Sequence, residues 1–136
     1  MINHKVEPYR IINNPKGNIY KVASKNQFPD FIKGDIYFSE VTSKTSKGWM
    51  RHLKLKAIFG VAEGELSIKI KSSDRQNIIS HRLSLESSKL IYISPGIWYG
   101  FQNNSNKKAL IFVILNGEHD KKEIERSDFN QKDCLK

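Results

Sequence analysis

Residues 47–56 read Lys-Gly-Trp-Met-Arg-His-Leu-Lys-Leu-Lys, and an apolar run then extends to Ala62 before a turn at Gly64. A glycine turn thus precedes a segment in which apolar and cationic residues alternate, with one histidine among them. Alternation with a period of two is typical of a β-strand that buries one face. The stretch therefore predicts a strand, and a histidine and several cations that face one way suggest a pocket for an anion.

The two faces of this strand follow from its period. In a regular strand over residues 49–56, one face carries Met50, His52, Lys54 and Lys56, and the other carries Trp49, Arg51, Leu53 and Leu55. A β-bulge would exchange the faces beyond it. His52 is the candidate general base, because imidazole titrates near neutral pH. The alternative is that His52 lies with the lysines on an ordinary solvated face.

The rest of the chain predicts an all-β domain. Short segments rich in Ile, Val, Phe and Tyr recur between Gly, Pro, Asn and Ser, as in a β-sandwich or barrel. Further strands are expected at residues 9–12, 18–22, 35–41, 57–62, 65–71, 78–85, 89–93 and 108–115. Residues 72–77 are expected to form a loop, and residues 120–126 at most two helical turns. The prediction is eight or more short strands and almost no helix.

Length and composition place the chain among cytoplasmic globular proteins. Its 136 residues, 38% of them hydrophobic, suit one domain with a real core. The single cysteine, Cys134, excludes an internal disulfide and a cysteine-based zinc cluster. No apolar run approaches the roughly 20 residues of a membrane span. The first seven residues lack the apolar core of a signal peptide.

The charge balance favours an anionic partner. The 23 Lys and Arg residues against 14 Asp and Glu give a net charge of +9. Nucleic acid, anionic lipid and phosphorylated metabolites all fit that charge. The lysines are scattered, however, and the chain has neither a recognition helix nor aromatic platforms for bases, so a nucleic-acid partner is disfavoured.

A second motif resembles the cupin superfamily. Residues 94–103 read Ser-Pro-Gly-Ile-Trp-Tyr-Gly-Phe-Gln-Asn, against the cupin pattern Pro-x-Gly-x-x-His-x-x-x-Asn. Gly96 and Asn103 match this pattern, whereas Ser94 takes the place of the proline and Tyr99 that of the metal-binding histidine. The resemblance implies an all-β double-stranded β-helix, the jelly-roll barrel of RmlC-like cupins.

The first cupin motif has lost most of its metal ligands. Gly48 and Gly64 can bracket its hairpin, and Met50 and His52 fall on the two histidines. The glutamate position falls on residues 56–57, which are lysine and alanine. Only His52 remains of four usual ligands, so the resemblance implies a cupin without a metal. A metal-dependent cupin with ligands placed elsewhere is a weaker alternative.

Residues 12–53 resemble a narrower group, the dTDP-4-dehydrorhamnose 3,5-epimerases and dTDP-4-keto-6-deoxyglucose 3,4-ketoisomerases. The ketoisomerases carry a strand with a tyrosine, followed by Arg-Gly-x-His-x-His. In this chain Tyr37 takes the tyrosine position, Lys47 the arginine, Met50 the first histidine and His52 the second. The whole resemblance covers roughly residues 10–126.

The epimerase pattern fits less well. The epimerases show Ser-x-Lys-Gly-x-x-Arg-Gly-x-His against residues 45–54. Arg51 then falls on the arginine that contacts the pyrophosphate, and Lys54 on the catalytic histidine. Their tyrosine acid would fall near Ile111 or Phe112, neither of which can donate a proton. Their histidine–aspartate dyad has no recognisable counterpart.

The resemblance implies an isomerase that uses neither metal nor cofactor. Its substrate would be a nucleotide-diphospho-4-keto-6-deoxy sugar for bacterial lipopolysaccharide or capsule. His52 would be the base and Tyr37 or Tyr99 the proton donor. The expected substrate-binding residues are Lys47, Arg51 and Lys54 for the pyrophosphate, and Trp49 and Trp98, whose favoured alternative is core or rim packing. His4, His81 and His119 are predicted to be surface residues.

Two further expectations concern organisation. The chain is predicted to be a single cupin domain over residues 1–136, with the barrel at about 10–117 and a charged tail at about 118–136. The resemblance also implies a homodimer, with residues 1–22 exchanged between subunits. Because the first histidine and the tyrosine acid are missing, a cupin that binds a sugar nucleotide without catalysis is the alternative function.

Overall fold

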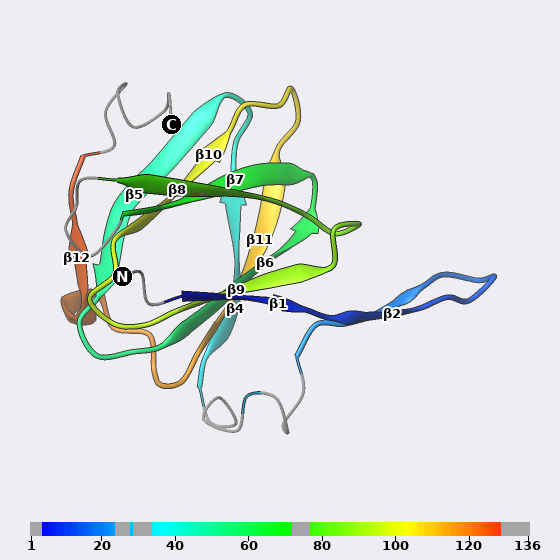
Figure 1. The fold of residues 1–136 in the computed structure, drawn as a ribbon, viewed down its shortest axis with the longest axis horizontal. Coiled ribbons are helices and arrows are strands. Elements are labelled where there is room, and N and C mark those ends of the chain that lie inside the picture. The colour runs from blue at the N-terminus through cyan, green and yellow to red at the C-terminus, as the bar shows by residue number, and fades with distance from the viewer. Residues whose placement is uncertain (1–3, 24–27, 29–33, 72–76, 129–136) are drawn as a thin grey trace.

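The protein folds into two antiparallel sheets that face each other and enclose the core (Figure 1). The structure, a computed structural model, describes residues 4–23, 28, 34–71 and 77–128. Cys134 and most of the predicted loop at 72–77 lie outside these residues. The described part of the chain contains no helix with the length and hydrophobicity of a transmembrane segment. The predicted all-β architecture is confirmed.

Both sheets have five strands. The first has the order β1 (His4–Pro8), β9 (Lys89–Ile93), β6 (Ala57–Glu63), β11 (Ala109–Leu115) and β4 (Ile36–Val41). The second has the order β12 (Ile124–Arg126), β5 (Thr45–His52), β10 (Tyr99–Asn103), β7 (Glu65–Lys71) and β8 (Ile78–Ser84). A separate hairpin of β2 (Arg10–Ile12) and β3 (Ile19–Lys21) projects from the barrel (Figure 1).

The core lies between the sheets because their strands alternate as the sequence predicts. In β7, Leu66, Ile68 and Ile70 are all buried. Burying side chains of this size stabilises a fold by about 1.5–3 kcal/mol each. The core also contains a group of aromatic rings, in which the Phe59 centroid lies 4.8 Å from that of Tyr99 and 5.4 Å from that of Phe101. Tyr99 thus joins the core to the candidate site.

Strand β5 differs from its prediction at both ends. It begins at Thr45 and ends at His52, so Lys54 and Lys56 lie beyond it. In the turn that follows, the backbone N–H groups of Lys54 and Leu55 donate to the Glu123 carboxylate instead of to a neighbouring strand. This bond pattern explains why a regular strand over residues 49–56 was the wrong expectation.

A β-bulge lies within β5. Tyr99 of β10 pairs with Met50, whereas the next residue, Gly100, pairs with Gly48, so Trp49 is an extra residue. Beyond the bulge, Met50 packs against the core and His52 is buried. Met50 and His52 therefore share the inner face, as the sequence predicts.

The segment at 120–126 stays within the predicted limit of at most two helical turns. It forms one 3-10 turn at Lys121–Glu123 and then strand β12, which was not predicted. The Asp120 side chain caps the turn by accepting from Lys122 N at 3.0 Å. Strand β12 pairs with β5, placing Ile124 opposite His52. The sheets therefore extend beyond the predicted barrel of residues 10–117, through β1 at one end and β12 at the other.

Candidate active site

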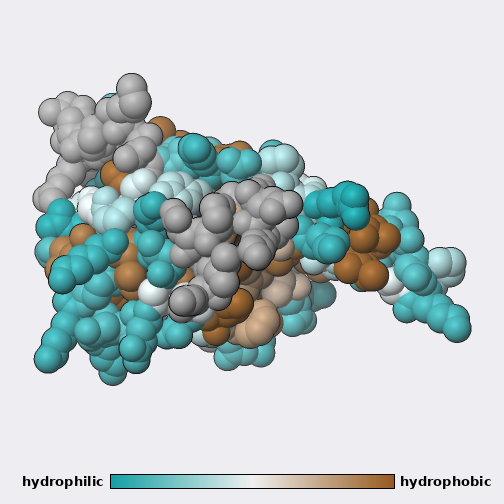
Figure 2. All heavy atoms as spheres, turned by 90° about the horizontal axis from the view of Figure 1, so that it is seen from below, coloured by the Kyte–Doolittle hydropathy of each residue, from teal (hydrophilic) through white to brown (hydrophobic). Residues whose placement is uncertain are grey.

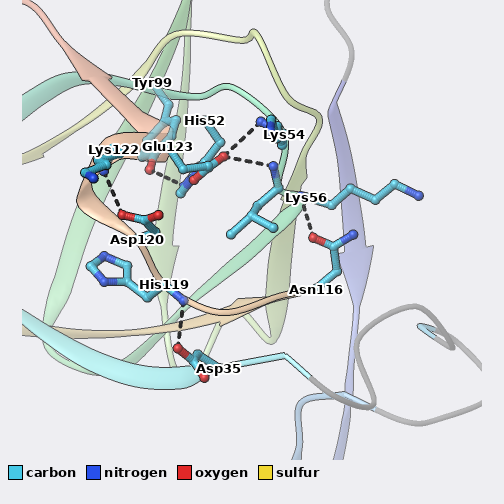
Figure 3. Close-up of polar contacts among 11 residues, drawn as sticks. Asp35, His52, Lys54, Lys56, Tyr99, Asn116, His119, Asp120, Lys122 and Glu123 are labelled. Carbon is cyan, nitrogen blue, oxygen red and sulfur yellow. Dashed lines mark hydrogen bonds and ion pairs between the residues drawn. The ribbon is translucent and has the colours of Figure 1, made fainter.

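Three side chains from separate parts of the chain form one hydrogen-bonded series (Figure 3). Glu123 ends the 3-10 turn, His52 ends β5, and Tyr99 begins β10. His52 Nδ1 lies 2.8 Å from Glu123 Oε2, and the Tyr99 hydroxyl lies 3.0 Å from His52 Nε2. The imidazole is 2% exposed, so these bonds are shielded from water.

The chemistry of the carboxylate fixes the proton positions in this series. Burial alone would raise the pKa of Glu123, but hydrogen bonds from His52, Leu55 N and Lys54 N outweigh it and lower the pKa. An ionised carboxylate only accepts hydrogen bonds, so His52 Nδ1 carries the proton and donates it. The lone pair of His52 Nε2 is then available to accept the Tyr99 hydroxyl.

Tyr99 is held in its protonated form. Burial is the main cause that raises the pKa of its phenol, and neighbouring Tyr37 raises it further, while Arg126 opposes the shift. A free tyrosinate is therefore disfavoured at neutral pH. The phenol can release its proton only if its oxygen accepts another proton at the same time.

A cavity of about 400 Å³ opens beside Tyr99, within the range of about 300–1,000 Å³ typical of small-molecule sites. Its inner wall is apolar and includes Phe59 and Val113, whereas its rim carries the cationic Lys47 and Arg126. The remaining lining residues are Tyr37, Ser39, Gly48, Met50, Phe101, Ile111, His119 and Ile124. His52 does not line the cavity, because Tyr99 separates the imidazole from it.

The structure brings four predicted site residues together. His52 and Tyr99 are hydrogen-bonded, and Tyr37 and Lys47 line the same cavity as Tyr99. The Lys47 ammonium donates to Ser39 Oγ at 3.0 Å, which joins β5 to β4 at the cavity rim. Burial is the main cause that raises the pKa of the Tyr37 phenol, so this group is also protonated.

The other predicted binding residues do not line this cavity. Arg51 pairs with Glu125 at 2.9 Å and lies 4.8 Å from the centre of the Trp98 ring. Trp49 is fully buried and lies beneath the Lys71 ammonium. Lys54 is exposed in the turn after β5. Arg51 and Trp49 do not line the cavity because they lie on the outer face of β5. Lys54 does not line it because the strand ends at His52, before this residue.

Sequence reasoning missed three residues of the site, all in the segment predicted to be a tail. Glu123 orients His52, and His119 and Arg126 line the cavity. No local pattern marks them, because the contacts that hold Glu123 and His119 in place are to His52 and Asp35, which lie 71 and 84 positions away in the chain. His119 is exposed, in agreement with its prediction as a surface residue, and it also lines the cavity.

The prediction for the other two histidines is corrected. His4 of β1 and His81 of β8 were expected to be surface residues, but both are half-buried, and their Nε2 atoms lie 3.0 Å apart. Within the described ranges, no group of three His, Cys, Asp or Glu side chains is arranged as a set of metal ligands.

Comparison with known proteins places the chain in a family. A family model described as "FdtA: WxcM-like, C-terminal" matches residues 3–133. No curated protein sequence matches the chain.

Solved structures share the fold. A dTDP sugar isomerase from Desulfovibrio desulfuricans G20 is 24% identical, with a TM-score of 0.84 over 96% of this chain and 87% of that one. The 3,4-ketoisomerase QdtA from Thermoanaerobacterium thermosaccharolyticum, solved as a point mutant in complex with TDP-4-keto-6-deoxyglucose, is 19% identical, with a TM-score of 0.79 over 93% and 89%. The rmlC epimerase from Mycobacterium tuberculosis is 12% identical, with a TM-score of 0.78 over 90% and 68%. The predicted RmlC-like cupin barrel is thereby confirmed, and the chain belongs to the FdtA family of WxcM-like, C-terminal domains.

Proposed function

We propose that the protein is an isomerase that moves a proton next to the C4 ketone of a nucleotide-diphospho-4-keto-6-deoxy sugar. The observation that carries this proposal is the Glu123–His52–Tyr99 series, which ends at a cavity with a cationic rim. The family match and the isomerases and epimerases among the similar structures support the reaction type. We favour the ketoisomerase over the epimerase, because the two isomerases match over 87% and 89% of their length and the rmlC epimerase over 68%.

The three residues can move a proton without forming a free phenolate. As the Tyr99 oxygen takes a proton from the carbon beside the ketone, its own proton passes to His52 Nε2. The resulting imidazolium is stabilised by the Glu123 carboxylate at 2.8 Å. General base catalysis of this kind contributes about 10²–10⁴-fold to a rate. His52 thus remains the proton acceptor proposed from the sequence, but it acts through Tyr99.

The cavity rim suits the charges of the substrate. Lys47 and Arg126 can hold the diphosphate, and whichever cation lies nearer the ketone can stabilise the enolate that forms. In this proposal Arg126 takes the role that the sequence gave to Arg51 and Lys54. We place the reaction in the supply of sugars for bacterial surface polysaccharides, either lipopolysaccharide or capsule.

Deuterium exchange tests this proposal. The protein is incubated with dTDP-4-keto-6-deoxyglucose in deuterium oxide, and the sugar is analysed by NMR. Deuterium at C4 of a 3-keto product, with deuterium at C3 of the remaining 4-keto sugar, supports the ketoisomerase, and deuterium at both C3 and C5 of a 4-keto sugar supports the 3,5-epimerase. His52→Asn and Tyr99→Phe should each lower exchange by at least about 100-fold, while the affinity for dTDP stays within a few-fold.

The non-catalytic alternative rests on Met50, an unreactive side chain in the cavity wall where the ketoisomerase motif has histidine. A protein that binds dTDP-sugar but catalyses no exchange at C3 or C5 would support this alternative. The same result would refute the isomerase.

We also propose that the protein is a homodimer. On the outer face of β4, Ile36 and Phe38 are 66% and 63% exposed. They border an apolar cavity of about 500 Å³, which also includes Phe112, Ile114 and Tyr20 of the projecting hairpin. Figure 2 shows apolar atoms at the base of this hairpin. A second copy that covers this face would bury them and would shield the edge of β4.

A further inference from the structure

A pair of histidines joins the two sheets at one edge of the barrel. His4 lies on β1, which ends the first sheet, and His81 lies on β8, which ends the second. Their Nε2 atoms are 3.0 Å apart. We propose that these two imidazoles bind one divalent transition-metal ion, such as Zn²⁺, which holds the two edge strands together. The site is separate from the cavity with Tyr99, which neither histidine lines.

The backbone brings the two side chains to this position. All five residues of β1 pair with β9, and all seven residues of β8 pair with β7. Directly after β1, Tyr9 N donates to Ser88 O at 2.9 Å, and the Tyr9 hydroxyl donates to Leu85 O at 2.8 Å. Both ends of β1 are therefore held against residues 81–88, and the two imidazoles are positioned before any ion binds.

The separation of the two nitrogens fits two ligands of one ion. Imidazole nitrogens bind Zn²⁺ at about 2.0–2.1 Å, so two of them on one ion lie about 2.9–3.4 Å apart for angles of about 90–110° at the metal. The ring planes are inclined by 60° and the centroids are 5.1 Å apart, so the rings meet at their nitrogen atoms and do not stack. A hydrogen bond between two neutral imidazoles has a similar length and is the alternative to a metal site.

The hydrogen bond alone leaves the pair incompletely satisfied. His4 Nδ1 is buried, and no group among the described residues forms a hydrogen bond with it. A buried polar atom without a partner costs free energy. Coordination of an ion at Nε2 would offset this cost, because the free energy of binding an ion adds to the free energy of folding.

Both imidazoles are able to bind an ion at neutral pH. Burial is the main cause that lowers the pKa of each, and the pKa of His4 is lowered further by His81, as that of His81 is by Lys89. The neutral forms, whose lone pairs can bind a metal, therefore predominate at pH 7. Imidazole suits Zn²⁺, Cu²⁺ and Ni²⁺, whereas Mg²⁺ and Ca²⁺ prefer oxygen ligands.

Two protein ligands make this an open site. In the part of the chain that the structure describes, no third His, Cys, Asp or Glu completes a group of ligands. Water would fill the other positions, since both histidines are only half-buried. The exposed Lys89 on β9 acts on His81 through its charge. That charge also opposes a cation, so its removal should strengthen metal binding.

Metal titration of the full chain tests the site. The protein is treated with a chelator, which is then removed, and Zn²⁺ is added at neutral pH in a titration calorimeter. One equivalent should bind, and saturating Zn²⁺ should raise Tm, because the ion binds the folded state. His4→Gln and His81→Gln should each lower the affinity by at least about 10-fold and abolish the rise in Tm. Lys89→Gln should bind Zn²⁺ a few-fold more tightly.

The matched control is His119→Gln, which removes an exposed histidine at the rim of the cavity with Tyr99 and should bind Zn²⁺ as the wild type does. Loss of binding in this variant, with His4→Gln and His81→Gln unaffected, would place the ion in that cavity and refute the site. A wild type that binds no Zn²⁺, or an unchanged affinity in both variants of the pair, would also refute it. The Tm of each variant without Zn²⁺ shows that it is folded. His4→Gln and His81→Gln lie outside the cavity and should retain C3 exchange, so the isomerase proposal is tested separately.

Discussion

At the scale of single residues, Glu123 is the most informative position, because it touches His52 but not the cavity. Glu123→Gln should lower kcat between about 10-fold and 1,000-fold with little change in KM, since the neutral amide cannot stabilise the imidazolium. The amide oxygen can still accept from Lys54 N and Leu55 N, so the turn should remain folded. Steady-state kinetics check this prediction. Glu125→Gln, two positions along and paired with Arg51, is the control, and an equal loss there would contradict the role given to Glu123.

The lowered pKa of Glu123 also predicts how the stability of the folded protein depends on pH. Its pKa in the folded protein lies below the ordinary value of 4.5. The carboxylate therefore stabilises the fold above the unfolded pKa, and this stabilisation is lost as the pH falls through the folded pKa. Below about pH 4.5, Tm should decline more steeply in the wild type than in Glu123→Gln. Thermal melts between pH 3 and 7 test this, and parallel curves for the two proteins would show that the carboxylate is not linked to folding.

The sequence identified His52, Tyr37, Tyr99 and Lys47 because each lies at a motif position. It could not identify Glu123, since the bond to His52 joins residues 71 positions apart and an isolated glutamate has no local signature. For the same reason no local pattern indicates that the exposed His119 lines the cavity. Its backbone is held by Asp35, a partner 84 positions away.

At the scale of elements, the predictions succeeded where the alternation is regular, and they failed at β5, which a bulge and a turn interrupt, and at β12. Strand β7 alternates over seven residues, and its bounds match the expected 65–71. Strand β12 has three residues, too few to show a period. The bulge at Trp49 left no pattern in the sequence, although it decides how β5 lies against β10.

The junction between β11 and β4 gives a prediction at this scale. A Cβ atom at Gly34 would lie 1.4 Å from the backbone oxygen of Leu115, so Gly34→Ala must move the end of β11 away from β4. We expect a loss of about 1–3 kcal/mol in the free energy of unfolding, as for other overpacked sites. The displaced segment carries His119, so product formation should fall as well. Denaturant unfolding measures the first effect. Glu40→Ala, exposed on the same strand, should leave the midpoint unchanged, and a wild-type midpoint in Gly34→Ala would refute the close contact.

At the scale of the whole molecule, the fold class was predictable, because motif order and spacing over roughly residues 10–126 resemble one family. The path of residues 118–128 was not predictable, because the charged residues of this segment resemble those of a solvated tail. In the folded chain residues 124–126 pair with β5, and residues 118–128 supply Glu123 and line part of the cavity.

The apolar outer face of β4 gives the last prediction. In the described part of the chain, β4 ends its sheet and the β2–β3 hairpin pairs only with itself. A lone two-stranded hairpin is marginally stable in water. We therefore expect a second copy of the chain to cover both the hairpin and the exposed strand β4. Phe38→Lys should convert a dimer into a monomer, because it would bury an unpaired charge at the contact.

Light scattering after size-exclusion chromatography measures this change, with Glu40→Gln on the same face as the control. A monomeric wild type would refute the dimer, and a dimer mass retained by Phe38→Lys would refute the outer face of β4 as its interface. The cavity with Tyr99 lies inside the barrel, apart from the outer face of β4. A monomeric Phe38→Lys variant should therefore still catalyse C3 exchange, and loss of exchange on dissociation would mean that the second copy completes the site.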